Sequence, residues 1–206
     1  MIKLGQNAVE LKGIDKVYIG STQVYGAPSG YRKLTGLTFN NAPYYVITNF
    51  RLKGSDTLRF SFDASTACNI LGCYTNGSAQ TNYSLYVGTS AAQYLRYNGG
   101  TYNSQVTAGT RYNVVMTPTG TSGMKTDSTW TAKDFDCVSD FCIGTTSTAA
   151  ASAKLTGSLY GNITVDGRAV FVPCERVSDN ALGYYELLTD TFYTPTGGTP
   201  TSLGYA

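Results

Sequence analysis

Histidine is absent from the 206 residues of this sequence, and glutamate occurs only three times. Histidine is the commonest general base and the commonest metal ligand in proteins. Its absence excludes serine–histidine and cysteine–histidine nucleophiles, although serine–lysine variants stay formally open. These absences favour a binding protein over an enzyme.

Long apolar runs and strong charge are also missing. No run approaches the roughly 18 residues of a membrane-spanning helix, and residues 1–7 lack the apolar segment of a signal peptide. We therefore expect a soluble chain synthesised in the cytoplasm. A net charge of +2 does not indicate a strongly positive surface that would bind nucleic acid or an acidic membrane. No glycine-rich phosphate loop leads from a strand into a helix, so nucleotide binding has no support.

Tyrosine and glycine are abundant, with 17 and 23 copies, and the chain is rich in threonine, serine and asparagine. This composition is typical of short strands joined by tight polar turns. Alternating segments recur about every ten residues, as in an antiparallel sandwich. In Asp56–Asp63 the alternation puts Leu58, Phe60 and Phe62 on one face. Further core candidates near the front of the chain are Leu34, Leu37, Phe39, Tyr45, Ile47 and Phe50.

The clearest element is a long β-hairpin over Leu155–Cys174. Residues alternate between small or apolar and polar types up to Val165, and an apolar segment returns from Arg168. Asp166-Gly167 is typical of a two-residue hairpin turn. Pro173 is expected to end the second strand.

The continuation of this hairpin, VPCERVSDNALGYYELLTDTFYTP from Val172, resembles the closing segment of concanavalin A-like (laminin-G-like) jelly-roll domains of bacteriophage and prophage virion proteins. The similar steps are Pro173-Cys174-Glu175-Arg176, Gly183-Tyr184-Tyr185-Glu186 and Thr191-Phe192-Tyr193-Thr194. The Gly-Tyr step at Tyr31 resembles the usual opening of that family. The resemblance implies an all-β fold, an antiparallel concanavalin A-like jelly-roll sandwich over residues 31–206.

Residues 1–25 are expected to form a separate β-hairpin element, and 26–30 a short linker. The phrase KVYIGSTQVYG resembles a short element that precedes laminin-G-like domains in phage proteins, which implies attachment or oligomerisation. The expected attachment residues are Val17, Tyr18, Ile19, Val24 and Tyr25. The alternative is an extra pair of strands that covers the sandwich.

The five cysteines are expected to be buried free thiols that behave as small hydrophobic residues. Cys68 and Cys73 are five positions apart, as are Cys137 and Cys142, so in a strand the members of each pair point to opposite faces. Zinc binding or disulfide pairing is the alternative, but the spacing matches a four-cysteine zinc site only loosely. No cofactor is expected.

Carboxylates offer little support for catalysis. Glucanases with a concanavalin-like fold present Glu-x-Asp-x-x-Glu on one strand, and that string does not occur here. Asp134 and Asp136, two positions apart, are the best pair. We interpret them as solvated turn residues; a calcium site completed by Asp140 is the alternative.

A candidate carbohydrate-binding patch consists of Tyr97, Asn98, Tyr102, Asn103 and Trp130. Tyrosine rings can stack on sugars while amides bind hydroxyl groups. Against this, tyrosines in strands are mostly half-buried, and Trp130 fits core or inter-subunit packing.

Together, these observations predict a non-enzymatic phage virion surface protein, either a head fibre or capsid decoration or a tail-associated adhesin. Its expected partners are capsid or tail proteins, bound through the N-terminal element, and a host-surface polysaccharide. A trimer or dimer is expected. The alternatives are a stand-alone soluble lectin and a glycan hydrolase.

Overall fold

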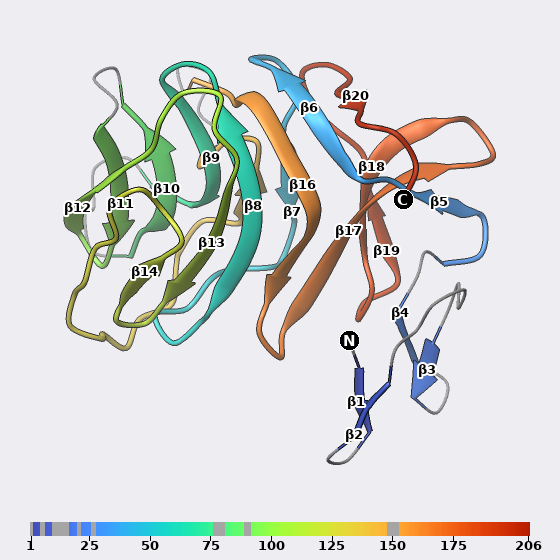
Figure 1. Cartoon of the computed structure of the whole chain (residues 1–206), viewed down its shortest axis with the longest axis horizontal. Coiled ribbons are helices and arrows are strands. Elements are labelled where there is room, and N and C mark those ends of the chain that lie inside the picture. The colour runs from blue at the N-terminus through green and yellow to red at the C-terminus, as the bar shows by residue number, and fades with distance from the viewer. Residues whose placement is uncertain are drawn as a thin grey trace.

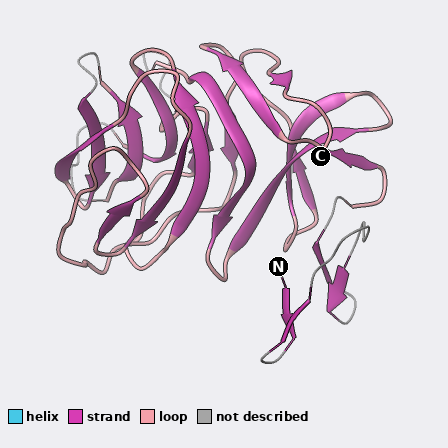
Figure 2. Cartoon of the chain, in the orientation of Figure 1, coloured by secondary structure: helices cyan, strands magenta, loops and turns pink. Residues whose placement is uncertain are grey.

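The computed structural model describes the backbone of residues 2–4, 7–9, 17–19, 22–25, 28–75, 81–88, 92–147 and 153–206. Side chains are described from residue 28 onward, except within residues 76–80, 89–94 and 148–152. Over these ranges the regular structure is entirely β (Figure 2), and none of it is a helix able to span a membrane.

One sheet has six strands in the order β12-β11-β10-β9-β15-β7, and every neighbouring pair is antiparallel (Figure 1). The strands are β7 (Tyr45–Ile47), β9 (Cys68–Cys73), β10 (Tyr83–Val87), β11 (Ala92–Tyr97), β12 (Gly100–Gln105) and β15 (Phe141–Ile143).

The other large sheet has ten strands, with the main path β14-β13-β8-β16-β17-β18-β19. Strands β6 and β20 attach beside β16, and β5 attaches beside β17. The strands are β5 (Tyr31–Lys33), β6 (Gly36–Asn40), β8 (Leu58–Ala64), β13 (Tyr112–Thr117), β14 (Gly120–Ser122), β16 (Thr156–Val165), β17 (Ala169–Arg176), β18 (Ala181–Glu186), β19 (Thr191–Tyr193) and β20 (Thr201–Ser202).

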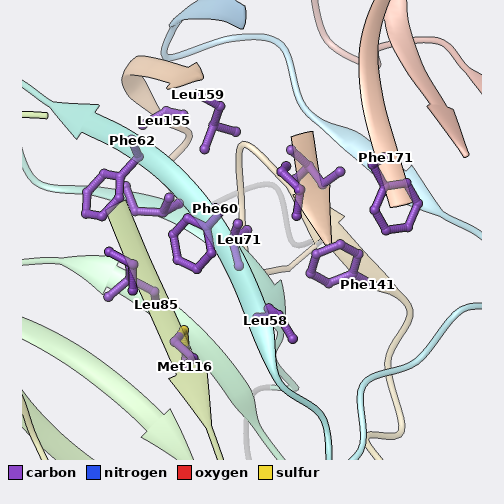
Figure 3. Close-up of a cluster of buried hydrophobic side chains, with 14 of the residues drawn as sticks. Leu58, Phe60, Phe62, Leu71, Leu85, Met116, Phe141, Leu155, Leu159 and Phe171 are labelled. Carbon is purple, nitrogen blue, oxygen red and sulfur yellow. The ribbon is translucent and has the colours of Figure 1, made fainter. Parts of the chain in front are cut away.

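The two sheets pack face to face around one apolar core. Figure 3 shows Leu58, Phe60 and Phe62 of β8 in the same cluster as Leu71 and Leu85 of the six-stranded sheet. The predicted β8 alternation is confirmed, because Arg59 and Ser61 between these residues are more exposed. The predicted front-half core is also confirmed, with Phe50 only partly buried. The antiparallel two-sheet sandwich inferred from the sequence is therefore the observed fold.

The predicted hairpin is present as β16 and β17, but the two strands pair with each other over only three positions, Ile163–Val165 with Ala169–Phe171. Earlier in β16, Thr156–Tyr160 pairs with β6, and later in β17, Cys174–Arg176 pairs with β5. The continuous segment that carries β5 and β6 therefore enters between the diverging strands.

Two local predictions about this hairpin are wrong. Three residues separate the paired Val165 and Ala169, and Gly167 alone among them has a positive φ, of 70°. A type I′ turn needs positive φ at both central residues, so the turn is of another type. Pro173 does not end β17. It lies where the neighbour of β17 changes from β16 to β5, and its carbonyl accepts a hydrogen bond from Leu34 N–H at 2.8 Å.

Near the N-terminus, β1 (Ile2–Leu4) pairs with β2 (Asn7–Val9), and β3 (Val17–Ile19) pairs with β4 (Thr22–Tyr25). The β3–β4 pair coincides with the hairpin expected around residues 20–22. The β1–β2 pair was not expected from the sequence. Within the linker, the described residues 28–30 form a turn closed by a hydrogen bond from Tyr31 N–H to the Pro28 carbonyl.

Candidate functional site

The predicted carbohydrate patch does not form on the surface, because Tyr97 is a core residue that is 1% exposed. Its ring stacks on Trp130 with a centroid separation of 5.1 Å. Its hydroxyl donates to the Gly54 carbonyl at 2.9 Å and accepts a hydrogen bond from Lys133 N–H at 2.9 Å. The ring and the hydroxyl of Tyr97 are thus both in contact with the protein itself, and the buried ring cannot stack on a sugar.

Trp130 is also buried, which confirms the alternative assignment of core packing. Tyr102 is partly buried and packs on the indole of Trp130 at a centroid separation of 5.0 Å. Asn98 has a left-handed backbone, with φ of 46°, in the turn between β11 and β12, and Asn103 is exposed on β12. The five residues are neighbours, but they do not present an open aromatic face.

The three aspartates of the calcium alternative are not gathered either. Asp134 is exposed, Asp136 pairs with Lys53 at 3.5 Å, and Asp140 pairs with Arg51 at 3.5 Å. The segment before Asp136 is not a strand, so Asp134 and Asp136 do not share a strand face. Over the residues whose side chains are described, no cluster of three or more cysteines, aspartates or glutamates could hold a metal ion.

All five cysteines are buried free thiols, as predicted. Burial raises the pKa of Cys142 and of Cys174 to about 12 in each case, so both stay protonated at neutral pH. The five expected attachment residues lie in β3 and β4. Their side chains are outside the described residues, and the attachment role stays a prediction.

A pocket that was not predicted from the sequence lies on the outer face of the six-stranded sheet, over β9, β10 and β11. These three strands are neighbours in that sheet (Figure 1). Its volume is about 270 Å³. It is lined by Ala67, Cys68, Asn69, Tyr74, Ser84, Tyr86, Val87, Arg96, Thr146 and Ala153.

Strand register brings the polar part of this wall together. Ser84 of β10 lies directly opposite Arg96 of β11. Their neighbours Leu85 and Leu95, also a paired position, are in the core. Since successive side chains of a strand point to opposite faces, Ser84 and Arg96 project from the outer face.

The Arg96 guanidinium lies over the ring of Tyr74, 4.3 Å from its centroid. Arg96 is the only charged residue of the pocket wall and has no carboxylate partner in the part of the chain whose side chains are described. Ser84 is 4% exposed, and its hydroxyl is not one of the buried side-chain groups that lack a hydrogen-bond partner among the described residues. The pocket therefore places a guanidinium group and a hydroxyl group side by side, and the guanidinium has no acidic partner among the described residues.

Asn69 has a structural role in the same wall. Its side-chain amide donates to the Ala153 carbonyl at 2.6 Å, and its oxygen accepts a hydrogen bond from the Thr146 hydroxyl at 3.0 Å. These bonds fix Thr146 and Ala153 against β9. The far wall of the pocket is thus held by a residue of the sheet.

The lining chemistry suits recognition. Cys68 carries the one nucleophilic thiol of the wall, and burial is the main cause that raises its pKa, so the reactive thiolate is disfavoured at neutral pH. Among its described residues, the wall contains no aspartate or glutamate to act as general acid or base. What it offers is aromatic surface, hydroxyl groups and one cation.

A second pocket, of about 230 Å³, shares the wall residues Ala67 and Val87 with the first. The rest of its lining is small or uncharged, including Ala64, Ser65 and Thr66. The two pockets therefore adjoin at Ala67 and Val87.

No protein-family model matches the chain, and no curated protein has significant sequence similarity to it.

Proposed function

We propose that this chain is a non-enzymatic binding protein of a bacteriophage particle surface, and that its sandwich binds saccharide in the pocket over β9, β10 and β11. The observation that carries the binding proposal is that Arg96 and Ser84 lie opposite each other, beside the ring of Tyr74, in a preformed hollow. Binding sites are commonly such hollows, with a few polar groups that fix the orientation of the ligand.

The shape and chemistry of the hollow favour a saccharide. Sugars present alternating apolar ring faces and hydroxyl groups, which match aromatic side chains interspersed with hydroxyls. Two contiguous pockets suit a chain of sugar units. The absence of carboxylates from the described wall supports binding without hydrolysis.

The phage setting is supported by the resemblance of residues 172–194, which form the neighbouring strands β17, β18 and β19. The finer fold assignment, a concanavalin A-like jelly roll, belongs to the same proposal. It is supported by a chain path that passes repeatedly between the sheets, as from β6 to β7, β8 and β9. In this proposal the N-terminal element docks on a capsid or tail protein, and the particle carries the protein as a trimer or dimer.

A glycan array printed with host-surface polysaccharides tests the binding site. We expect binding by the intact chain, and weaker binding by Arg96→Gln with the thermal melting temperature unchanged. Incubation of the same polysaccharides with the protein should release no new reducing ends. Released ends would establish a hydrolase, and an array without any bound glycan would contradict the binding proposal.

The particle setting has its own experiment. Immunogold electron microscopy of intact virions should place the protein on the head or the tail surface. A chain lacking residues 1–25 should remain folded but should not be incorporated. Retained incorporation would contradict docking through the N-terminal element, and an unlabelled virion would favour a stand-alone lectin.

A further inference from the structure

We infer that the pocket selects saccharides that carry a carboxylate, such as uronic acids, and that Arg96 and Ser84 bind that carboxylate. The inference rests on the saccharide binding proposed above and narrows it to a chemical class. It is carried by the unpaired state of one arginine in a hollow that holds no acidic side chain.

Arg96 differs from the other arginines in its surroundings. Five of the seven arginines form an ion pair with an aspartate or glutamate. Within the described residues, Arg96 and Arg111 form none, and both lie over a tyrosine ring. Arg111, however, is exposed, and the hydroxyl of its tyrosine, Tyr160, donates to Asp63, so a carboxylate is already close by. Arg96 has no such counter-charge in its wall.

The tyrosine ring also determines how Arg96 can be used. Stacking on Tyr74 covers one face of the planar guanidinium and leaves its N–H edge as the binding group. A guanidinium edge matches the two oxygens of a carboxylate, and such charge-assisted bonds are about twice as strong as neutral ones.

Ser84 supplies a second donor at the right place. Directly opposed residues on antiparallel strands have Cβ atoms roughly 4.5–5.5 Å apart, and Ser84 opposes Arg96. Ser84 also lines the pocket, so its hydroxyl can reach a ligand bound beside Arg96. A hydroxyl can donate a hydrogen bond to a carboxylate oxygen, and a bond to an ionised acceptor is stronger than one between neutral groups.

A free anion would leave most of the site empty. The pocket of about 270 Å³ adjoins the second pocket at Ala67 and Val87, and among the described residues no further charged side chain lines either one. Arg96 and Ser84 therefore occupy one part of a larger, neutral wall. That arrangement fits a carboxylate attached to a sugar ring better than an inorganic ion.

The test compares trigalacturonic acid, which carries charged carboxylates, with its methyl ester, in which these groups are neutral. Binding is measured by isothermal titration calorimetry with the full chain. We expect the acid to bind at least about tenfold more tightly than the ester, the size of effect that one charge-assisted contact gives. Arg96→Gln should abolish this preference, and Arg96→Lys should restore part of it. Ser84→Ala should weaken acid binding about threefold or more. Arg111→Gln is the matched control and should bind as the unmodified chain does.

Three results would overturn the inference. Equal binding of acid and ester that survives Arg96→Gln would leave saccharide binding intact but remove the selectivity. Competition by sodium acetate or inorganic phosphate at the same concentration as the trisaccharide would show a simple anion site. Binding of neither probe, with neutral glycans also unbound, would contradict the proposed function as well. A melting curve of each variant identifies any loss of binding that is caused by unfolding. If Arg96→Gln does not fold, Arg96→Lys tests the role of the guanidinium group in its place.

Discussion

Burial gives residues of one type very different roles in this chain. Tyr45, Tyr83 and Tyr184 are fully buried, and burial is the main cause that raises the pKa of each hydroxyl. Tyr97 uses its hydroxyl to join two loop segments through Gly54 and Lys133. The Tyr184 hydroxyl, by contrast, has no hydrogen-bond partner among the described residues. The oxygen of a buried tyrosine therefore stabilises the fold at one site and not at the other.

This contrast predicts opposite results for the same substitution. Tyr97→Phe should lower the free energy of unfolding by about 1–3 kcal/mol, because it leaves the Lys133 N–H and the Gly54 carbonyl unpaired. Tyr184→Phe should be neutral or stabilising by up to about 1 kcal/mol, because it removes an unsatisfied buried group. Urea unfolding measures both. Equal losses in the two variants would contradict this account.

Ion pairs offer a second comparison at the residue scale. Arg168 pairs with Asp56, whose side chain is only 3% exposed, while Arg59 and Asp166 are about half exposed. Arg168→Ala should cost about 3–5 kcal/mol, because it leaves a buried carboxylate without its cation. Arg59→Ala should cost about 0.2–1 kcal/mol. Chemical denaturation of both variants checks the difference, which should also persist at high salt.

At the scale of elements, the fork between β16 and β17 is the feature that shapes the larger sheet. Strand β16 changes partner along its length, and its pairing with β8 is irregular between Tyr160 and Thr164. Gly161 lies at this irregularity with φ of 61°, and its N–H donates to the Thr35 carbonyl at 2.8 Å. A left-handed residue here lets β16 leave β6 and meet β17.

Gly161→Ala should therefore destabilise the fold by about 1–2 kcal/mol through backbone strain alone. An added Cβ would meet no atom within 4 Å, so steric overlap does not contribute. The neighbouring exposed residue gives the control, since Asn162→Ala should change stability by less than about 0.5 kcal/mol. Thermal or urea unfolding measures the stability of both variants. Unchanged stability of Gly161→Ala would mean that the divergence of β16 and β17 does not require a left-handed backbone at position 161.

At the scale of the whole molecule, the absence of histidine and the burial of thiols and phenols together determine how stability depends on pH. No side chain with an ordinary pKa near 6.5 is present. Cys142 and Cys174, in contrast, have folded-state pKa values of about 12, raised from 9.0 by burial. Because the unfolded chain ionises first, these groups stabilise the fold fully below pH 9 and lose that contribution as pH rises toward 12.

We accordingly expect the urea midpoint to be nearly constant from about pH 6 to 8 and to fall steadily above about pH 9. In the double variant Cys142→Ala, Cys174→Ala the fall above pH 9 should be shallower but still present, because burial also raises the pKa of Cys68 and of Cys73. A fall of stability between pH 8 and pH 6 would contradict the explanation that buried thiols and phenols determine the pH dependence.

How far the site could be predicted depends on single positions. In Tyr94-Leu95-Arg96-Tyr97 the alternation already put Leu95 and Tyr97 on one face and Arg96 on the other. The prediction of a carbohydrate-binding patch, which took Tyr97 as a surface ring, did not use that signal. The other walls of the pocket could not be anticipated, because Thr146 and Ala153 reach β9 only through contacts with Asn69, 77 and 84 positions away.

The sequence by itself determined the all-β class, the two-layer sandwich, the buried thiols and the place of the main hairpin. These depend on alternation and turn residues, which act between neighbours along the chain. Only the tertiary structure decided that β5 and β6 enter between β16 and β17, and that Ser84, Arg96 and Tyr74 meet in a hollow. Strand partners and pocket walls are set by which faces exclude water together across the whole fold, and that depends on contacts between distant segments.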